Sequence, residues 1–155
     1  MRPTSTTTPS NRHKSHRLTG AKLKLLSAIP SLYCSTPYDL ARFIRGRIPT
    51  EHDVRSVRAT LARIEEYSYP QKWLVKKYLN GVTYFGLSHS GVRYAHEELG
   101  IMSARVFEIK DIPHEHLITE CHIPLQEYAS ANGYELAWEQ NVTDLSLIHT
   151  PSPRD

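Results

Sequence analysis

An α+β fold is predicted for this 155-residue chain by three observations. Three successive segments between residues 19 and 69 carry apolar side chains at helical spacing. Two short β-type runs follow directly, and the Asn80-Gly81 pair that joins them is typical of a two-residue hairpin turn. The hydrophobic content of 39% and the mean hydropathy of −0.47 are typical of a soluble protein with an ordinary core.

Two helices are predicted before residue 47. The first begins after Thr19, which can cap it, and Pro30 limits its C-terminal extension. Its apolar positions are Leu23, Leu25, Leu26 and Ile29. The second has Ser35 or Thr36 as its N-cap and ends at Gly46. Its first-turn and stripe residues are Pro37, Asp39, Leu40, Phe43 and Ile44.

The third predicted helix begins at the cap residue Thr50 and is closed by Pro70. Its core-facing positions are spaced 3, 4 and 3 residues apart: Val54, Val57, Leu61 and Ile64. The side chains that point the other way are His52, Arg55, Ser56, Ala59 and Arg63. Arg58 flanks the core stripe. This helix is therefore predicted to present a basic surface.

A β-hairpin is predicted over residues 72–78 and 82–87. A two-residue turn pairs Leu79 with Val82 and Lys77 with Tyr84, which places Lys76 and Lys77 near the tip. Ser88 or Ser90 then caps a fourth helix, which Gly100 ends. The apolar positions of the fourth helix are Val92, Tyr94, Ala95 and Leu99.

The chain after residue 100 is predicted to begin a second, incomplete domain. Residues 101–113 are interpreted as a connector. A helix is expected over about 114–132, with Gly133 as its stop and a strand at 134–139. Residues 114–144 are therefore interpreted as a partial α/β segment.

The last eleven residues, Leu145 to Asp155, do not resemble folded protein. Leu-Ser-Leu-Ile-His back-translates as CTG TCT CTT ATA CAC, which resembles the start of a transposase-type sequencing adaptor, and the rest resembles its continuation. We interpret residues 145–155 as an adaptor artefact, so that the natural chain was cut near residues 142–144. The alternative is a genuine Pro- and Ser-rich tail.

Charge is distributed unevenly along the chain. Residues 1–110 carry 18 Lys and Arg against 8 Asp and Glu, whereas residues 111–155 carry 1 against 8. Residues 1–17 are interpreted as a disordered basic tail that includes Arg12, Lys14 and Arg17. The basic part is expected to meet an acidic partner such as nucleic acid, and the alternative is a surface that is basic for solubility.

Three helices, a hairpin wing and a fourth helix, as predicted for residues 18–100, are the order of a winged helix-turn-helix. In that fold the third helix enters the major groove of DNA and the wing contacts the backbone. The predicted recognition-helix set is His52, Arg55, Ser56, Arg58 and Arg63, the hairpin set is Lys72, Lys76 and Lys77, and the tail set is Arg12, Lys14 and Arg17. An ordinary solvated face is the alternative.

The sequence also resembles a known family. The segments that carry the resemblance are LTGAKLKLLSAI, YDLARFI, DVRSVRATLARIEEYSY, WLVKK with NGVTYFGLSHSGVRYAHEELG, and HEHLITECHIPLQEYASANGYELAWEQ. From about residue 18 to residue 139 they are similar to the replication-relaxation family of bacterial plasmids and mobile elements. That resemblance implies double-stranded DNA as the partner, a cytoplasmic site of action, and members that continue beyond the point where this chain stops.

No catalytic, metal or cofactor motif is recognised, and we expect a protein that is not an enzyme. The one tempting cluster is His114, His116, Cys121 and His122. His116 and His122 are six residues apart and point away from each other on a helix, so ordinary partners are favoured over zinc. Cys34 and Cys121 are expected to be free thiols. No membrane span and no small-molecule ligand are expected.

The first functional hypothesis is an accessory or regulator of plasmid or element replication. The second is a winged-helix transcriptional repressor, which the sequence does not separate from the first. The third is a protein-interaction module whose basic face binds an acidic protein. The acidic residues 111–155 could compete with DNA for the basic face, bind a partner, or join two copies of the chain in a dimer.

Overall fold

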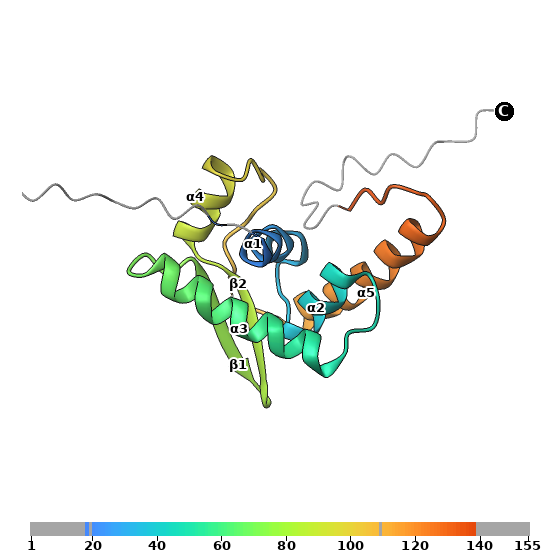
Figure 1. Ribbon diagram of the computed structural model, residues 1–155, viewed down its shortest axis with the longest axis horizontal. Coiled ribbons are helices and arrows are strands. Elements are labelled where there is room, and N and C mark those ends of the chain that lie inside the picture. Colours follow the sequence, from blue (N-terminus) through green and yellow to red (C-terminus); the bar gives the residue numbers. More distant parts are fainter. Residues whose placement is uncertain (1–17, 19, 109, 139–155) are drawn as a thin grey trace, which may run out of the picture.

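Five helices and one β-hairpin make up the part of the chain that the structure, a computed structural model, describes, namely residues 18, 20–108 and 110–138. Figure 1 shows them in order. The elements are α1 Ala21–Leu32, α2 Pro37–Arg45, α3 Glu51–Ser68, β1 Leu74–Leu79, β2 Val82–Leu87, α4 His89–Glu97 and α5 Ile112–Ala131. The predicted α+β class is confirmed.

The starts of α2 and α3 use the same local device. At each start a threonine hydroxyl accepts the N–H of an aspartate three residues later, at 3.2 Å, and the carboxylate accepts the threonine N–H in return. The two pairs are Thr36 with Asp39 and Thr50 with Asp53. This reciprocal bonding satisfies amides that a helix start leaves without intrahelical partners. The predicted starts of both helices are confirmed.

Helix α1 differs from its prediction at three places. Its N-cap is Gly20, without a side-chain bond, and the expected cap Thr19 lies outside the described residues. Pro30 lies inside the helix, which continues to Leu32. Proline removes only one hydrogen bond here, and the burial of Ile29 and Leu32, both 0% exposed, favours continuing the turn. Leu23 was expected in the core stripe but is 37% exposed.

The link between α1 and α2 joins the hairpin. Tyr33 has φ 62° and ψ −57°, and the Cys34 N–H donates to the Leu32 carbonyl at 2.7 Å, which makes a tight three-residue turn. Ser35 then pairs with Phe85 through two backbone hydrogen bonds of 3.2 and 2.8 Å. The link is therefore joined to the outer edge of β2 by an isolated bridge.

The hairpin has the predicted register. Leu79 lies opposite Val82 and Lys77 lies opposite Tyr84. The turn residues Asn80 and Gly81 have φ of 50° and 82°, as a two-residue turn of this type requires. Strand β1 begins at Leu74 rather than at residue 72, because Lys72 has φ 51° and turns the chain before the strand.

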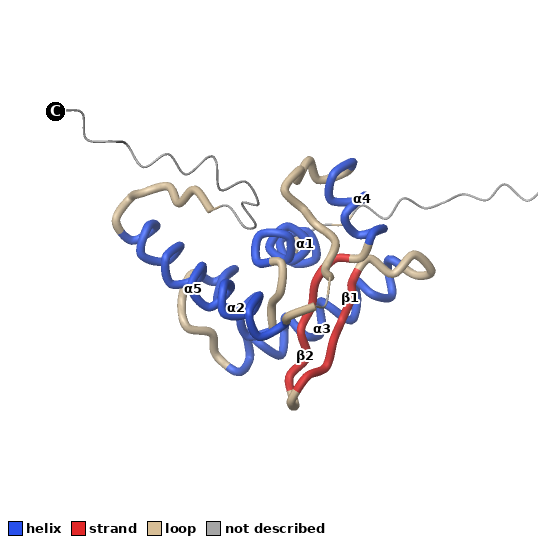
Figure 2. Tube along the Cα trace, turned by 180° about the vertical axis from the view of Figure 1, so that it is seen from behind, coloured by secondary structure: helices blue, strands red, loops and turns tan. Residues whose placement is uncertain are grey.

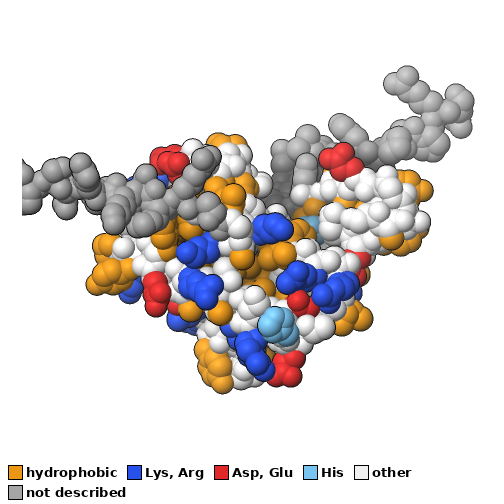
Figure 3. Space-filling view, viewed as in Figure 1, with side chains coloured by type: hydrophobic (Ala, Val, Ile, Leu, Met, Phe, Trp, Pro, Cys, Tyr) orange, Lys and Arg blue, Asp and Glu red, His pale blue; other side chains and the backbone are white. Residues whose placement is uncertain are grey.

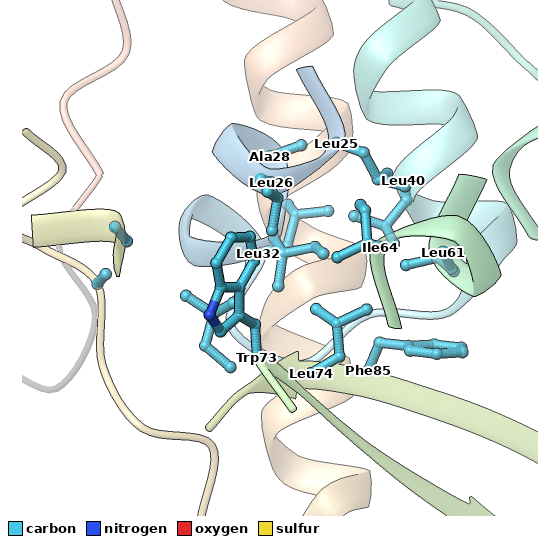
Figure 4. Close-up of a cluster of buried hydrophobic side chains, with 14 of the residues drawn as sticks. Leu25, Leu26, Ala28, Leu32, Leu40, Leu61, Ile64, Trp73, Leu74 and Phe85 are labelled. Carbon is cyan, nitrogen blue, oxygen red and sulfur yellow. The ribbon is translucent and has the colours of Figure 1, made fainter. Parts of the chain in front are cut away.

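The two faces of the hairpin pack against different parts of the chain. One face contributes Leu74, Phe85 and Leu87 to the main core, which Figure 4 shows converging with side chains from α1, α2 and α3. On the other face, Val75, Leu79 and Tyr84 pack against a second cluster that holds Tyr33, Cys34, Phe107 and Ile112. The hairpin is thus buried on both sides near its base, and Figure 2 shows it from behind.

The segment predicted as a connector takes part in this sheet. Val106 forms a parallel bridge with Leu87, and the Phe107 N–H donates to the Leu87 carbonyl at 2.8 Å. The Phe107 ring covers Gly86, where a side chain would overlap it. Helix α4 begins after Ser88, as predicted, but it ends at Glu97, three residues before Gly100.

Helix α5 packs beside α2 (Figures 1 and 2), and its first turns contact the hairpin through Ile112 and His116, which lie against Tyr84. It begins at Ile112, earlier than predicted, because Asp111 caps it by accepting the His114 N–H at 3.2 Å. Ile123 belongs to the main core, and Arg42 of α2 forms two bonds with Glu127, at 2.7 and 2.9 Å. The helix expected to open a second domain thus packs on α2 and contributes Ile123 to the main core.

The strand expected after α5 is not formed over residues 134–138, so the prediction of a partial α/β segment is wrong there. The Tyr134 N–H donates back to the Ala129 carbonyl at 2.8 Å, which closes the helix end. The Trp138 ring stacks on His122 at 4.4 Å between centroids. Through these local contacts, residues 134–138 pack against α5. Residues 139–144 lie outside the described residues.

Replacing Thr119 with valine is expected to lower the free energy of unfolding by about 2 kcal/mol. The Thr119 hydroxyl is 0% exposed and shares its hydrogen between the Leu32 and Cys34 carbonyls, at 2.9 and 2.6 Å. Valine keeps the shape and leaves both carbonyls buried without this donor. Urea unfolding measures the change, and Thr119→Ser, which keeps the hydroxyl, should cost less than Thr119→Val.

Candidate nucleic-acid interface

The outward surface of α3 carries the predicted recognition-helix set. The five residues His52, Arg55, Ser56, Arg58 and Arg63 are all exposed. On the face shown in Figure 3, Lys and Arg side chains gather over α3 and the adjoining parts of the neighbouring helices. The capping box at Thr50 fixes where this helix starts, and the buried Leu61 and Ile64 fix which side it turns outward.

The recognition-helix set occupies two flanks of α3. His52, Ser56 and Arg63 are spaced four and seven residues apart and therefore lie on the same side of the helix. This side faces α1 and α2, because Ser56 lines a cavity together with Lys24 and Arg45. Arg58 shares the other flank with Glu65, seven residues on, and Glu65 bonds to Lys76 of the hairpin at 3.3 Å. Helix α3 therefore lies between two basic borders.

Two of the predicted cations have carboxylate partners in the free protein. Arg55 pairs with Glu51 one turn earlier at 3.2 Å, with both side chains at least 75% exposed. Lys76 pairs with Glu65 at 3.3 Å, and Lys76 is 59% exposed. Exposed pairs of this kind contribute about 0–1 kcal/mol, so exchanging either carboxylate for another anion costs little.

The hairpin set does not form one surface. Because side chains alternate along a strand, Lys76 faces α3 whereas Lys77 lies on the opposite face with Tyr84. Lys72 precedes the strand, and its carbonyl accepts the Ser88 hydroxyl at 2.6 Å. Of the three, Lys76 is the one placed beside the recognition-helix set. The tail set Arg12, Lys14 and Arg17 lies outside the described residues.

Two further arginines belong to the basic face and were missed from the sequence. Arg45 and Arg47 flank Gly46 at the end of α2, and each lies 3.1 Å from the Asp53 carboxylate. Both side chains are about half exposed, 51% and 54%. The sequence signal for these two residues was the Arg-Gly-Arg run shortly before Thr50. Their position on the basic face could not be predicted from it, because it depends on Asp53, a shared partner in the next helix.

Asp53 is a charged anchor for this corner. The Thr50 N–H and then the Thr50 hydroxyl stabilise the carboxylate, burial opposes them, and Arg47 adds attraction, so the pKa of Asp53 falls to about 2. The carboxylate therefore stays ionised at neutral pH. It caps α3 and holds Arg45 and Arg47 close to the exposed start of that helix.

The acidic helix α5 makes its polar contacts away from α3. Its bonds join α2 and the α1–α2 link: Glu127 with Arg42, His116 with Asp39 at 2.8 Å, and Thr119 with the Leu32 and Cys34 carbonyls. The described part of the acidic segment, up to residue 138, thus occupies the side of α2 and the hairpin. These contacts give the hypothesis of competition with DNA no support.

The tempting His and Cys cluster is divided between separate surroundings. His116 bonds to Asp39 and contacts the Tyr84 ring, whereas His122 packs between Phe43 and Trp138. Cys121 is exposed and free. In residues 18, 20–108 and 110–138, no three His, Cys, Asp or Glu side chains come together in a group that could hold a metal ion. Burial raises the pKa of the other free thiol, Cys34, to about 12.

Comparisons with known proteins found no matching family model, no similar curated protein and no similar solved structure. The resemblance to the replication-relaxation family therefore stays a prediction from the sequence. Across the described part of the chain, none of the helices has both the length and the apolar composition needed to cross a bilayer.

Proposed function

We propose that this chain binds double-stranded DNA as a winged helix-turn-helix, with α3 in the major groove and the hairpin as the wing. The order of the elements supports this, because α1, α2 and α3 are followed at once by β1 and β2. Two contacts of the hairpin also support it: the bridge between Ser35 and Phe85 ties the hairpin to the α1–α2 link, and the Lys76–Glu65 pair joins it to α3.

The observation that carries the proposal is the outward face of α3. All five residues of the recognition-helix set are exposed there, and cations border the helix on both flanks: Lys76 from the hairpin, and Arg45 and Arg47 from the end of α2. A helix of roughly 10–12 Å diameter fits the major groove of about 12 Å width, with a phosphate backbone on either side.

Binding would combine two kinds of contact. Arg63, Arg55 and Arg58 can reach base edges or phosphates, since guanidinium groups bond to both. His52 and Ser56 add donors at the start of α3, where base contacts of such helices concentrate. We propose a binding role without a catalytic step, in the cytoplasm, on plasmid or nucleoid DNA.

The biological role proposed first is that of an accessory or regulator of plasmid or mobile-element replication, which follows from the family resemblance alone. A transcriptional repressor with the same DNA interface is the second candidate. Both use the same residues, and the genes that lie beside this one would separate them. The third candidate, a protein-interaction module, uses the same basic face for an acidic protein.

The double variant Arg58→Ala, Arg63→Ala is expected to weaken DNA binding by the full chain and to lower the salt slope by about two contacts, roughly 0.9 each. Removing two cations from the α3 surface removes two sites that displace counterions from DNA. Fluorescence anisotropy on a random-sequence duplex, measured across a salt series, gives both quantities.

The control is Arg93→Ala, which removes one exposed arginine from α4. It should leave the salt slope unchanged within about a third of one contact. A wild-type chain that does not bind duplex DNA at low salt would contradict the proposal and favour the protein-interaction candidate. The proposal would also be contradicted if Arg93→Ala lowered the salt slope by as much per removed charge as the α3 double variant does.

A further inference from the structure

A cavity of about 220 Å³ lies between α1, α2 and α3, on the flank of α3 that faces away from the hairpin. Its polar walls come from all three helices: Lys24, Arg45, Asp53, Ser56 and Thr60. Leu25, Ala41, Ile44 and Val57 form the apolar part. Nothing in the sequence analysis singled out Lys24, and the recognition-helix set includes only Ser56 from this wall.

Lys24 is the most available cation of the cavity. Its side chain is exposed, and among the described residues its ammonium group has no ion-pair or hydrogen-bond partner. Arg45 contacts Asp53 through Nε, at 3.1 Å, and its side chain is 51% exposed. Among the described residues its terminal NH₂ groups donate no hydrogen bond. Lys24 and Arg45 therefore both line this cavity and have N–H groups that can donate hydrogen bonds to a ligand.

The one carboxylate in the wall does not cancel this charge. Asp53 accepts the Thr50 N–H and hydroxyl at 2.9 Å each, and it is also 3.1 Å from Arg47. Lys24 and Arg45 against Asp53 leave a charge of +1 on the cavity wall, and Arg47 behind Asp53 adds another. Ser56 adds a hydroxyl on the α3 side.

We propose that this cavity seats a phosphate of the DNA backbone, held by Lys24 and Arg45 beside the recognition helix. The inference rests on the proposed function, because it needs α3 to lie in the major groove. A helix in that groove has one strand on each flank. The hairpin border with Lys76 faces one strand, and the cavity border with Lys24 and Arg45 faces the other.

The chemistry of the cavity fits a phosphodiester. Phosphate oxygens accept charge-assisted bonds from an ammonium point charge and from the paired NH₂ groups of a guanidinium. A hydroxyl such as that of Ser56 is a further phosphate donor in protein–DNA interfaces. Because the phosphate would be held by α1, α2 and α3 together, this contact would fix the angle at which α3 enters the groove.

The test is Lys24→Gln in the full chain, with duplex binding measured by anisotropy across a salt series. The salt slope is expected to fall by about 0.9, which corresponds to an affinity loss of about eightfold at 0.1 M salt relative to 1 M. Lys24→Arg, which keeps the charge, should retain the wild-type slope. Lys110→Gln is the matched control, because Lys110 is an exposed lysine next to the start of α5, away from α3.

The outcomes separate this inference from the proposed function. If the wild type binds with a steep salt dependence and Lys24→Gln lowers the slope while Lys110→Gln does not, the phosphate seat is supported. If the wild type binds and the two glutamine variants have the same slope as the wild type, the inference is overturned and the proposed function stands. If the wild type does not bind DNA, both are overturned.

Discussion

Replacing Gly91 with alanine is expected to destabilise the fold by about 3 kcal/mol or more. Gly91 lies in the first turn of α4, where an added Cβ would overlap the Trp73 carbonyl oxygen and lie 3.0 Å from its carbon. That carbonyl is fixed, because it accepts the Ser88 N–H at 2.9 Å. The Trp73 ring is buried and stacked on Tyr94. Neither backbone segment can move without breaking these contacts.

Thermal unfolding followed by circular dichroism would measure this loss, with an expected decrease in Tm of roughly 10 °C or more. Ser90→Ala is the control, because it changes the neighbouring residue of the same turn and should alter stability by no more than about 0.5 kcal/mol. A Gly91→Ala variant that melts within a few degrees of the wild type would contradict the close approach of the first turn of α4 to the Trp73 carbonyl.

Replacing His116 with alanine is expected to cost about 3 kcal/mol near pH 5.5, where the imidazole is protonated, because it leaves Asp39 in a buried site without its cation. The two side chains are 18% and 10% exposed, and His116 Nε2 lies 2.8 Å from the Asp39 carboxylate. The hydrogen bond with Asp39 raises the pKa of His116 against the opposing effect of burial, and Glu120 at 3.8 Å adds to it. Burial alone would raise the pKa of Asp39, but the hydrogen bonds from His116 and Thr36 lower it overall.

The sign of each shift defines a pH window. A raised His116 pKa stabilises the fold fully below the unfolded value of about 6.5, and this contribution is lost as pH rises through the folded pKa. A lowered Asp39 pKa stabilises the fold above about 3.9, and this contribution is lost as pH falls through its folded pKa. The pair is therefore expected to stabilise α5 on α2 most between about pH 4 and pH 6.5.

His116→Gln isolates this contribution, since glutamine can still donate to Asp39 but does not titrate. The Tm difference between wild type and His116→Gln should be largest near pH 5.5 and should shrink by pH 9. The comparison with the variant is needed because burial lowers the pKa of His122, and this lowered pKa decreases the stability of both proteins at low pH. A Tm difference that is constant from pH 5.5 to pH 9 would contradict the charged pair.

Features set by neighbouring residues could be predicted from the sequence. The caps at Thr36 and Thr50 need only an aspartate three residues on, and the hairpin register follows from Asn80-Gly81. The outward side of α3 followed from the spacing of its apolar residues. In these places the interaction that decides the structure lies within a few positions of the chain.

Features set by distant partners could not be predicted. Ser35 pairs with Phe85, and Val106 pairs with Leu87, because folding brings backbone edges together that carry no side-chain signal. Arg45 and Arg47 join the candidate site through Asp53, and Lys24 joins it from α1 through the shape of a cavity. The separation of Lys76 from Lys77 is different, because strand alternation alone would have predicted it.

The separation of charge between the segment 111–138 and the basic face around α3 gives the molecule an electric dipole. Helix α3 itself carries three Arg against four Asp and Glu, and the excess positive charge of this face comes from Lys24, Arg45, Arg47 and Lys76 beside it. Residues 111–138 carry five Asp and Glu and neither Lys nor Arg. Three of the five lie in α5, which packs against α2. On the face shown in Figure 3, Lys and Arg side chains gather over α3 and the adjoining helices. In the field of a polyanion such a dipole experiences a torque before any contact forms, so the α3 face turns forward during approach. More of the collisions would then occur in a productive orientation, and added salt would slow association as well as weaken it.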